Sequence, residues 1–200
     1  LNCPMSLTYT QGKSDKAEFI RFLDACHEKG MSVFIADDRA DFRTLKKIGE
    51  EAYRKEVAEM VKDFGSHPAT YGFHVGDEPN LEEMEGVASL AVQICNEYAP
   101  HVTNFINLLP YCEDFVGADE YGARVSDFIK RSGIKVICYD CYAQCCYFDK
   151  EHYRDIYFEN LRIFGKAAKE NGIELFTSLL SVGHFSLRCP NEDDFRWQIS

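Results

Sequence analysis

The sequence predicts an α/β protein with the (β/α)8 TIM-barrel fold, incomplete in this chain, in which about six strands are visible. Segments rich in aromatic and β-branched residues alternate with amphipathic helical patterns at a spacing of about thirty to forty residues, which is typical of βα units in a parallel sheet. The glycine-rich phosphate loops of nucleotide-binding sheets are absent. A complete barrel takes about 250 residues, so 200 residues fit a barrel that lacks roughly one strand at each end.

The first half of the chain supplies three of these strands and two helices. The first helix has Ser14 as its N-cap and Gly30 as its C-terminal stop, and its apolar side chains recur three or four residues apart. The second helix is expected over residues 44–64, where a His-Pro pair ends it. The strands precede, separate and follow these helices, at residues 1–10, 31–36 and 70–75.

The second half of the chain repeats this alternation. Its helices end close to a proline or a glycine, which are both typical of helix C-termini. Because the sequence contains no linker or low-complexity segment, we expect residues 1–200 to form a single catalytic-type barrel domain, a fragment that lacks terminal strands. The helices are expected at residues 84–98, 121–129, 153–168 and after Pro190, and the strands at residues 102–109, 134–139 and 173–180.

Composition restricts the partners and the compartment. A formal charge of -11 argues against nucleic acid and anionic membrane surfaces, since both would repel the chain, and no apolar run reaches the ~20 residues of a membrane span. The nine cysteines include Cys26 and Cys95 on apolar helix faces, which favours buried free thiols and a cytoplasmic location. The chain begins at Leu1 and stops in mid-pattern, so we expect a piece of a longer protein, and secretion stays open. The oligomeric state is not predicted.

The stretch from Tyr71 to Asn80 carries the strongest functional signal. Side chains alternate along a strand, so the small and polar even-numbered positions share one face and the bulky apolar ones share the other. We expect the polar face to point into the barrel, which aims Glu78 over the barrel mouth and places His74 one layer below. Asp77 reaches the mouth only if Gly76 breaks the strand. The alternative role for Glu78 is an acidic residue in the first turn of a helix.

The segment Gly-Asp-Glu-Pro-Asn, from Gly76 to Asn80, resembles the Asn-Glu-Pro signature of the large TIM-barrel clan of retaining glycoside hydrolases. In that clan the signature ends the fourth strand and supplies the acid/base glutamate. Residues 105–110 and 138–142 resemble the fifth and sixth strands of such barrels. The resemblance implies a hydrolase that cleaves glycosidic bonds in a carbohydrate substrate, with Glu78 as general acid/base.

The sequence departs from this clan at the seventh strand. Retaining enzymes of the clan place a nucleophilic glutamate at the end of that strand, about 5–5.5 Å from the acid. The only carboxylate of residues 173–181, Glu174, lies at the amino end instead. The Asp77-Glu78 pair resembles that of hexosaminidases, in which the aspartate holds the substrate acetamido group as an internal nucleophile. Alternatively, Asp140 is a nucleophile or an inverting base, or the barrel binds a sugar without cleaving it.

Further candidates for substrate binding each have a structural alternative. An asparagine at a strand end suits hydroxyl recognition, but it also satisfies loop backbone groups. The aspartate that follows residues 31–36 has Arg39 close by, so a surface ion pair is its alternative, and the two tyrosines could belong to the core. The candidates are His74, Asn107, Tyr139, Tyr142, Asp37 and His184.

A C-x-x-C motif, Cys138 and Cys141, invites a zinc or redox interpretation. Residues three apart on a strand point to opposite faces, and no second C-x-x-C is present, so we predict no metal site and no cofactor. A metal-dependent barrel enzyme stays as an alternative, with His74, Asp77, Glu78 and Asp140 as its ligands.

Overall fold

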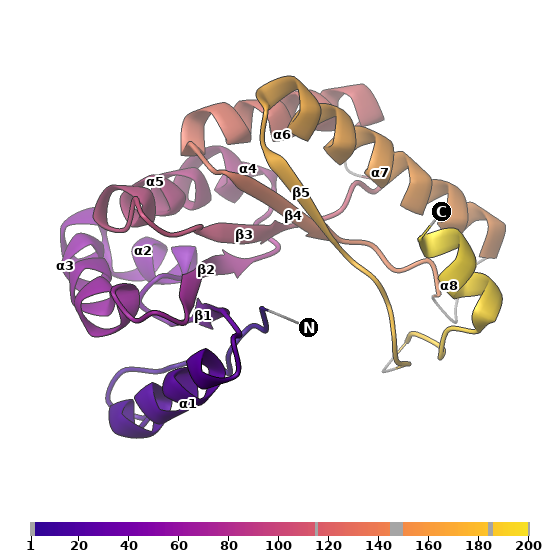
Figure 1. Ribbon diagram of the computed structural model, residues 1–200. Coiled ribbons are helices and arrows are strands. Elements are labelled where there is room, and N and C mark those ends of the chain that lie inside the picture. Colours follow the sequence, from indigo (N-terminus) through magenta and orange to yellow (C-terminus); the bar gives the residue numbers. More distant parts are fainter. Residues whose placement is uncertain (1–2, 115, 145–149, 184–185, 200) are drawn as a thin grey trace.

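The computed structural model of the chain describes residues 3–114, 116–144, 150–183 and 186–199. Five parallel strands form one sheet in the order β1-β2-β3-β4-β5, so each strand pairs with the next one along the chain. Helices connect the strands, as in a (β/α)8 barrel, and in the described residues the sheet stays open (Figure 1). The strands are β1 (Val33–Ala36), β2 (Thr70–Asp77), β3 (Phe105–Leu108), β4 (Val136–Asp140) and β5 (Glu174–Ser178).

The segment before the first helix was expected to be a strand, and it is only partly one. Two isolated parallel bridges join it to β1 and the residue after it, between Met5 and Phe34 and between Tyr9 and Asp37. The backbone N–H of Ser6 donates to the carbonyl of Phe34 over 2.9 Å, so the segment follows the edge of β1 without forming a continuous ladder.

Helices cover the outer face of the sheet (Figure 1). Asp15, rather than the predicted Ser14, caps the first helix, because its side chain accepts from the backbone N–H groups of Ala17 and Glu18. The α-helices are α1 (Lys16–Glu28), α2 (Phe42–Ile48), α3 (Glu50–Met60), α4 (Leu81–Glu83), α5 (Ser89–Tyr98), α6 (Ala118–Ser132), α7 (Lys150–Asn171) and α8 (Glu192–Gln198), and two π-helical turns are η1 (Val61–Gly65) and η2 (Met84–Ala88).

The single long helix predicted over residues 44–64 is wrong, since the chain turns at Gly49. The φ angle of Gly49 is +80°, a conformation that favours glycine, and this residue ends α2 and precedes α3. Helices α2 and α3 therefore replace the predicted one, and α2 contacts the carboxyl end of β2.

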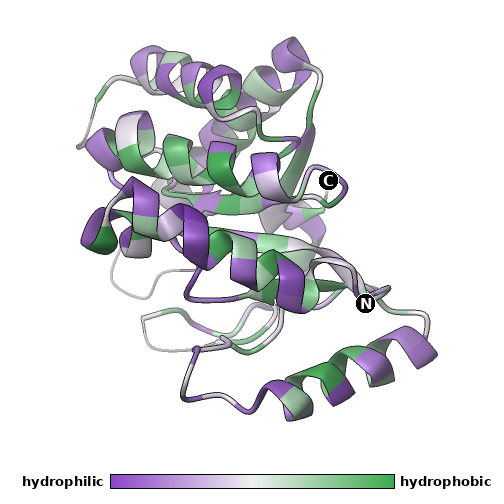
Figure 2. Ribbon diagram, turned by 90° about the vertical axis from the view of Figure 1, so that its left-hand side faces the viewer, coloured by the Kyte–Doolittle hydropathy of each residue, from purple (hydrophilic) through white to green (hydrophobic). Residues whose placement is uncertain are grey.

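Two apolar layers lie on opposite faces of the sheet. The larger one fills the space between the strands and the helices. Hydrophilic and hydrophobic residues alternate along these helices (Figure 2). The smaller layer lies on the concave face, where Phe34, Phe105 and Cys138 pack together with Phe176. Cys141 belongs to the outer layer, so the prediction that Cys138 and Cys141 face opposite sides is confirmed.

The described cysteines form no disulfide, and Cys26 and Cys95 are buried as predicted. Within the described residues, no helix combines the length and the apolar character that crossing a membrane requires.

Candidate active site

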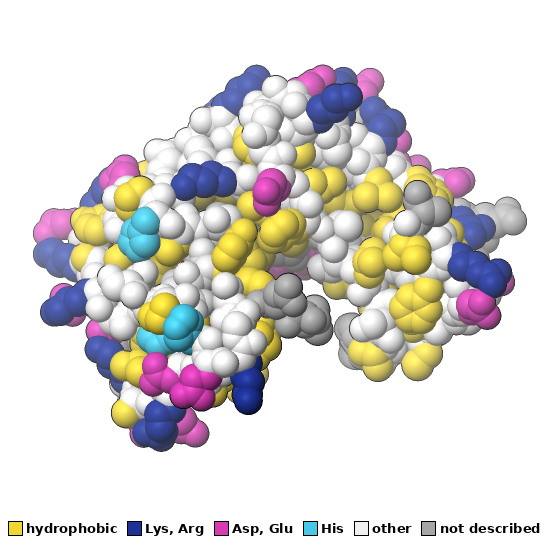
Figure 3. Space-filling model, in the orientation of Figure 1, with side chains coloured by type: hydrophobic (Ala, Val, Ile, Leu, Met, Phe, Trp, Pro, Cys, Tyr) yellow, Lys and Arg dark blue, Asp and Glu magenta, His cyan; other side chains and the backbone are white. Residues whose placement is uncertain are grey.

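A cleft of about 930 Å³ opens on the concave face of the sheet. Aromatic side chains form its floor, and polar side chains gather where the strands end. In the space-filling view, hydrophobic side chains spread across the middle of the molecule above the hollow (Figure 3). The residues that line the cleft are Cys3, Met5, Ser32, Phe34, Tyr71, His74, Asp77, Phe105, Asn107, Cys138, Asp140, Tyr142, Phe176, Thr177 and Ser178.

The end of β2 departs from regular strand geometry at two residues. Gly76 has a φ angle of +140°, and Glu78 has a φ angle of +46°, which is uncommon for a residue with a side chain. The alternation therefore stops at Gly76, and the condition for Asp77 to reach the barrel mouth is met, since Asp77 lines the cleft. Glu78 is exposed beside the cleft rather than among the residues that line it.

The start of β2 also differs from the expected alternation. Tyr71 was placed on the outer face with Phe73, but it lines the cleft and its ring lies 4.9 Å from that of Phe34. The cause is an irregularity in the pairing of β1 with β2, where Val33 pairs with Thr70 and the next residue pairs with Gly72. Tyr71 is the additional residue, which turns its side chain to the concave face.

Asn107 joins the two aspartates of the cleft. Its Nδ2 donates to Oδ1 of Asp140 over 2.6 Å and to Oδ1 of Asp77 over 2.9 Å. Strand β3 lies between β2 and β4, so a side chain at its carboxyl end is able to reach both neighbours. The Oδ1 atom of Asn107 is buried and has no hydrogen-bond partner among the described residues.

The three carboxyl groups at this end of the sheet affect one another. Partial burial of the Glu78 carboxyl group raises its pKa above the ordinary value, the negative charges of Asp140 and Asp77 raise it further, and the positive charge of Arg43 opposes the rise. Burial also raises the pKa of Asp140, while hydrogen bonds from Asn107 and Tyr142 oppose that rise. Glu78 therefore holds a proton to a higher pH than an ordinary glutamate.

The other polar residues of the cleft are His74 and Tyr142. Burial lowers the pKa of His74, although the charges of Asp77 and Asp41 oppose this change, so the imidazole is neutral at pH 7. The ring of His74 lies 5.0 Å from that of Phe105, one layer below the carboxylates. Tyr142 lies beside Asp140. Burial raises the pKa of its phenol, and the negative charge of Asp140 raises it further.

Two predicted substrate-binding residues lie away from the cleft. The side chain of Asp37 is 0% exposed and pairs with Arg39 over 2.8 Å, so the ion pair considered for it exists but is buried. Tyr139 is buried on the outer face, where its ring stacks on that of Phe164 with the centroids 4.2 Å apart, because its neighbours Cys138 and Asp140 take the inner face. His184 lies outside the described residues.

Arg43 is the residue near the carboxylates that the sequence did not indicate. It lies in the first turn of α2, and its Nη2 donates to the backbone carbonyl of Asp77 over 2.5 Å. A lone arginine in a helix gives no sequence signal of this contact, which depends on how α2 packs against β2. The aromatic floor, by contrast, follows from alternation in the predicted strands, with Phe34, Phe105 and Phe176 at inward positions.

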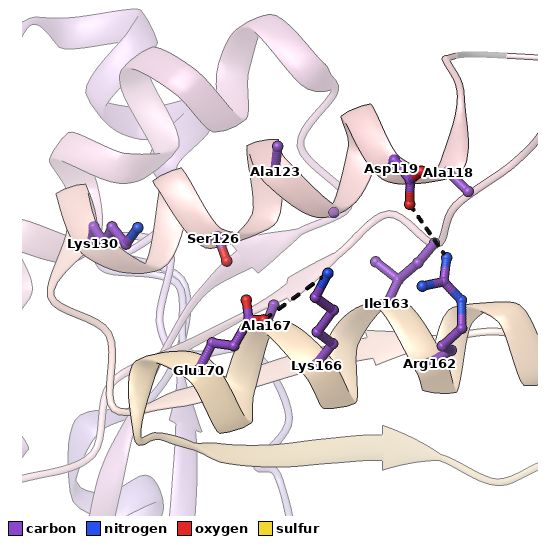
Figure 4. A pocket seen from close by; sticks show the side chains of 11 residues that line it. Ala118, Asp119, Ala123, Ser126, Lys130, Arg162, Ile163, Lys166, Ala167 and Glu170 are labelled. Carbon is purple, nitrogen blue, oxygen red and sulfur yellow. Dashed lines mark ion pairs between the residues drawn. The ribbon is translucent and has the colours of Figure 1, made fainter.

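A second hollow, of about 490 Å³, lies between α6 and α7 in the helix layer (Figure 4). Its charged groups face one another, with Arg162 3.9 Å from Asp119 and Lys166 4.0 Å from Glu170. None of the predicted site residues lines it. The concave cleft is therefore the candidate active site.

Comparison with solved structures shows the fold. The chain is similar to a Bacteroides thetaiotaomicron protein assigned as an alpha-L-fucosidase, with a TM-score of 0.67, 10% identity, and 99% of this chain and 69% of that chain covered. For a Thermobacillus composti GH10 xylanase the TM-score is 0.55, the identity 14%, and the coverage 98% of this chain and 68% of that chain. No model of a protein family and no curated protein matches the sequence.

A third similar structure is the catalytic domain of a Thermobifida fusca endoglucanase in complex with cellotetraose, with a TM-score of 0.51, 9% identity, and 98% of this chain and 81% of that chain covered. These likenesses confirm the predicted fold class, an incomplete (β/α)8 barrel. At such low identity they say nothing about which residues are catalytic.

Proposed function

We propose that the chain is a glycoside hydrolase, in which Glu78 is the general acid/base and Asp77 or Asp140 is the second carboxylate. The observation that carries this proposal is that Asp77 and Asp140, at the carboxyl ends of β2 and β4, share the amide of Asn107, and that their charges act on the neighbouring Glu78. In barrels of this class, chemistry takes place at that end of the sheet. Glycoside cleavage by a pair of carboxyl groups needs one of them protonated and one ionised.

The electrostatics support a division of roles. Glu78 has its pKa raised by burial and by two negative neighbours, which suits a group that must donate a proton to the leaving oxygen. Asp77 and Asp140 each accept a hydrogen bond from Asn107, and at Asp140 this bond opposes the rise in pKa that burial causes. We assign the role of proton donor to Glu78, and the role of second carboxylate to Asp77 or Asp140.

The cleft offers a surface that suits a sugar. The aromatic rings of its floor are able to contact the apolar faces of a pyranose, while neutral His74 and the hydroxyl of Tyr142 offer hydrogen bonds to its hydroxyl groups. Asn107 adds a buried oxygen to which no group of the described residues donates. A carbohydrate is therefore the proposed substrate, and His74, Asn107 and Tyr142 are its proposed polar contacts.

A panel of aryl glycosides tests the proposal with the purified chain. We expect turnover of at least one sugar, and for an alkyl glycoside of that sugar, whose leaving group needs a proton, we expect Glu78→Gln to lower kcat/KM by about 10²–10⁴-fold, the usual contribution of a general acid. A matched control is Glu51→Gln, an exposed glutamate of α3. Saturable binding of a sugar without turnover would replace the proposal with a carbohydrate-binding barrel, and full activity in Glu78→Gln would refute the assignment of Glu78.

The same panel identifies the second carboxylate. If Asp77 orients a substrate acetamido group, only 2-acetamido sugars are cleaved, and Asp77→Asn is nearly as damaging as Glu78→Gln. If Asp140 is the nucleophile or the inverting base, plain glycosides are cleaved and Asp140→Asn causes the larger loss.

The metal-dependent alternative stays a prediction that no observation favours. Within the described residues, no three His, Cys, Asp or Glu side chains are arranged to hold a metal ion.

A further inference from the structure

The first turn of α2 contacts the irregular end of β2 at successive points. Phe42 is buried against Gly76, where a Cβ would lie 2.4 Å from Cδ1 of the ring. Arg43 donates to the backbone carbonyl of Asp77. One turn further along α2, Lys46 forms an ion pair of 2.7 Å with Glu83 of α4. Helix α2 therefore contacts β2 at its irregular end and also contacts α4, the helix that comes next in the chain.

The peptide group between Asp77 and Glu78 is held at both ends. Its carbonyl oxygen accepts a hydrogen bond from Nη2 of Arg43 over 2.5 Å, and its N–H donates to the backbone carbonyl of Asn107 over 2.9 Å. This peptide precedes the left-handed backbone of Glu78, whose φ angle is +46°. Such a conformation persists only where the surroundings impose it.

Arg43 is itself held in place although its side chain is 54% exposed. Its backbone N–H donates to Oδ1 of Asp41 over 2.7 Å, and its Nη1 lies 3.3 Å from Oδ2 of the same residue. Its guanidinium group lies 4.6 Å from the ring centre of Phe42. One hydrogen bond and one cation–π contact thus orient the guanidinium group that reaches Asp77, and the backbone bond to Asp41 fixes the start of α2.

We propose that Arg43 is a positioning residue for the two acids, because it fixes the Asp77–Glu78 peptide and thereby the direction in which Glu78 faces Asp140. This inference rests on the proposed function for its catalytic meaning. The contact itself comes from the geometry of α2 and β2.

The positive charge of Arg43 also affects the pKa of Glu78, so this pKa provides a second measurement of the positioning role. The charged groups that act on Glu78 are Asp140 from β4, Asp77 from β2 and Arg43 from α2. Arg43 lowers the pKa of Glu78, so its removal raises that pKa further. In an enzyme that needs protonated Glu78, the alkaline limb of kcat/KM then moves to higher pH.

Amide hydrogen exchange tests the positioning directly. We expect the Glu78 amide to exchange about ten-fold faster or more in Arg43→Ala, because the peptide loses one of its two anchors. The matched control is Arg54→Ala, which removes an arginine of α3 that binds Glu50 and Glu97. Unchanged exchange in Arg43→Ala, or an equal change in Arg54→Ala, would overturn the proposal.

A carboxyl NMR titration of Glu78 provides the electrostatic part of the test, with Glu78→Gln to assign the signal. Arg43→Ala is expected to raise the pKa of Glu78, whereas Arg43→Lys keeps the positive charge and leaves that pKa close to the wild-type value. A pKa that is the same in all three proteins would contradict the electrostatic role.

Both readouts are independent of turnover. If they change as expected in a chain that cleaves no glycoside, the positioning role stands and the proposed function fails. If the chain is active but neither readout responds to Arg43→Ala, the proposed function stands and the positioning role fails.

Discussion

At the scale of single residues, Gly76 determines the shape of the candidate active site. Its φ angle of +140° ends the strand alternation, and its missing side chain lets Phe42 approach the backbone. Asp77 consequently joins the cleft and Glu78 lies beside it. The backbone conformation of Gly76 thus determines the positions of Asp77 and Glu78, although glycine has no reactive side chain.

Replacing Gly76 with Ala tests this account. The new Cβ would meet Phe42 at 2.4 Å in a backbone conformation that L-residues rarely adopt. We expect a loss of about 1–3 kcal/mol in the free energy of unfolding, measured with urea, and a loss of activity larger than this instability explains. In the control Gly165→Ala, a Cβ in α7 meets nothing within 4 Å, so stability stays equal or rises. Equal stability of the two variants would contradict the role given to Gly76.

Strand ends indicated most of the site in advance. Asp77, Glu78 and Asp140 each follow a predicted strand, Asn107 lies near the end of one, and the carboxyl ends of parallel strands meet at one edge. Tyr71 was misplaced because an irregular pairing of two strands leaves no mark in one sequence. Arg43 was missed because its role depends on the packing of a helix, which residue spacing does not encode.

At the scale of elements, a buried ion-pair network anchors the end of β1. Arg39 binds Asp37 with two nitrogen atoms and Asp63 of η1 with a third, each within 3.0 Å. Lys16 of α1 binds Asp63 as well. The network connects the carboxyl end of β1 to the helices on both sides. Asp37 is therefore a structural residue, although its place at a strand end resembled that of a substrate ligand.

Loss of this pairing is expected to be costly. Asp37→Asn would leave the buried charge of Arg39 with only Asp63 as its partner, so we expect a loss of about 3 kcal/mol in the free energy of unfolding. The control is Glu51→Gln, which breaks the exposed pair with Lys55 in α3 and is expected to cost at most about 0.5 kcal/mol. Calorimetry or urea titration of the two variants measures the difference, and equal losses would show that the network does not anchor β1.

Element boundaries followed the sequence where glycine marked them. Gly133 ends α6 with a φ angle of +64°, which agrees with the prediction that helices in the second half end close to a proline or a glycine. Gly49 has the same property, but it lies between two amphipathic runs and was not recognised as a break. The N-terminal segment does not form the predicted strand, because among the described residues it makes two isolated bridges, to β1 and to the residue after it.

At the scale of the whole molecule, the chain is an open part of a (β/α)8 barrel whose concave face carries the cleft. The alternation of strands and helices made this architecture predictable, because local periodicity determines each βα unit. Its assignment to glycoside cleavage depends on a few side chains at one end of the sheet. Fold alone supports many chemistries, so the acid must be tested directly.

The most direct test compares two glycosides of the same sugar, one with an alkyl leaving group and one with a dinitrophenolate leaving group. Proton donation by Glu78 matters for the alkoxide but hardly for the phenolate. We predict that Glu78→Gln lowers kcat/KM by about 10²–10⁴-fold for the alkyl glycoside and far less for the dinitrophenyl glycoside. An equal loss on both substrates, or no loss on either, would contradict the assignment of Glu78 as the proton donor.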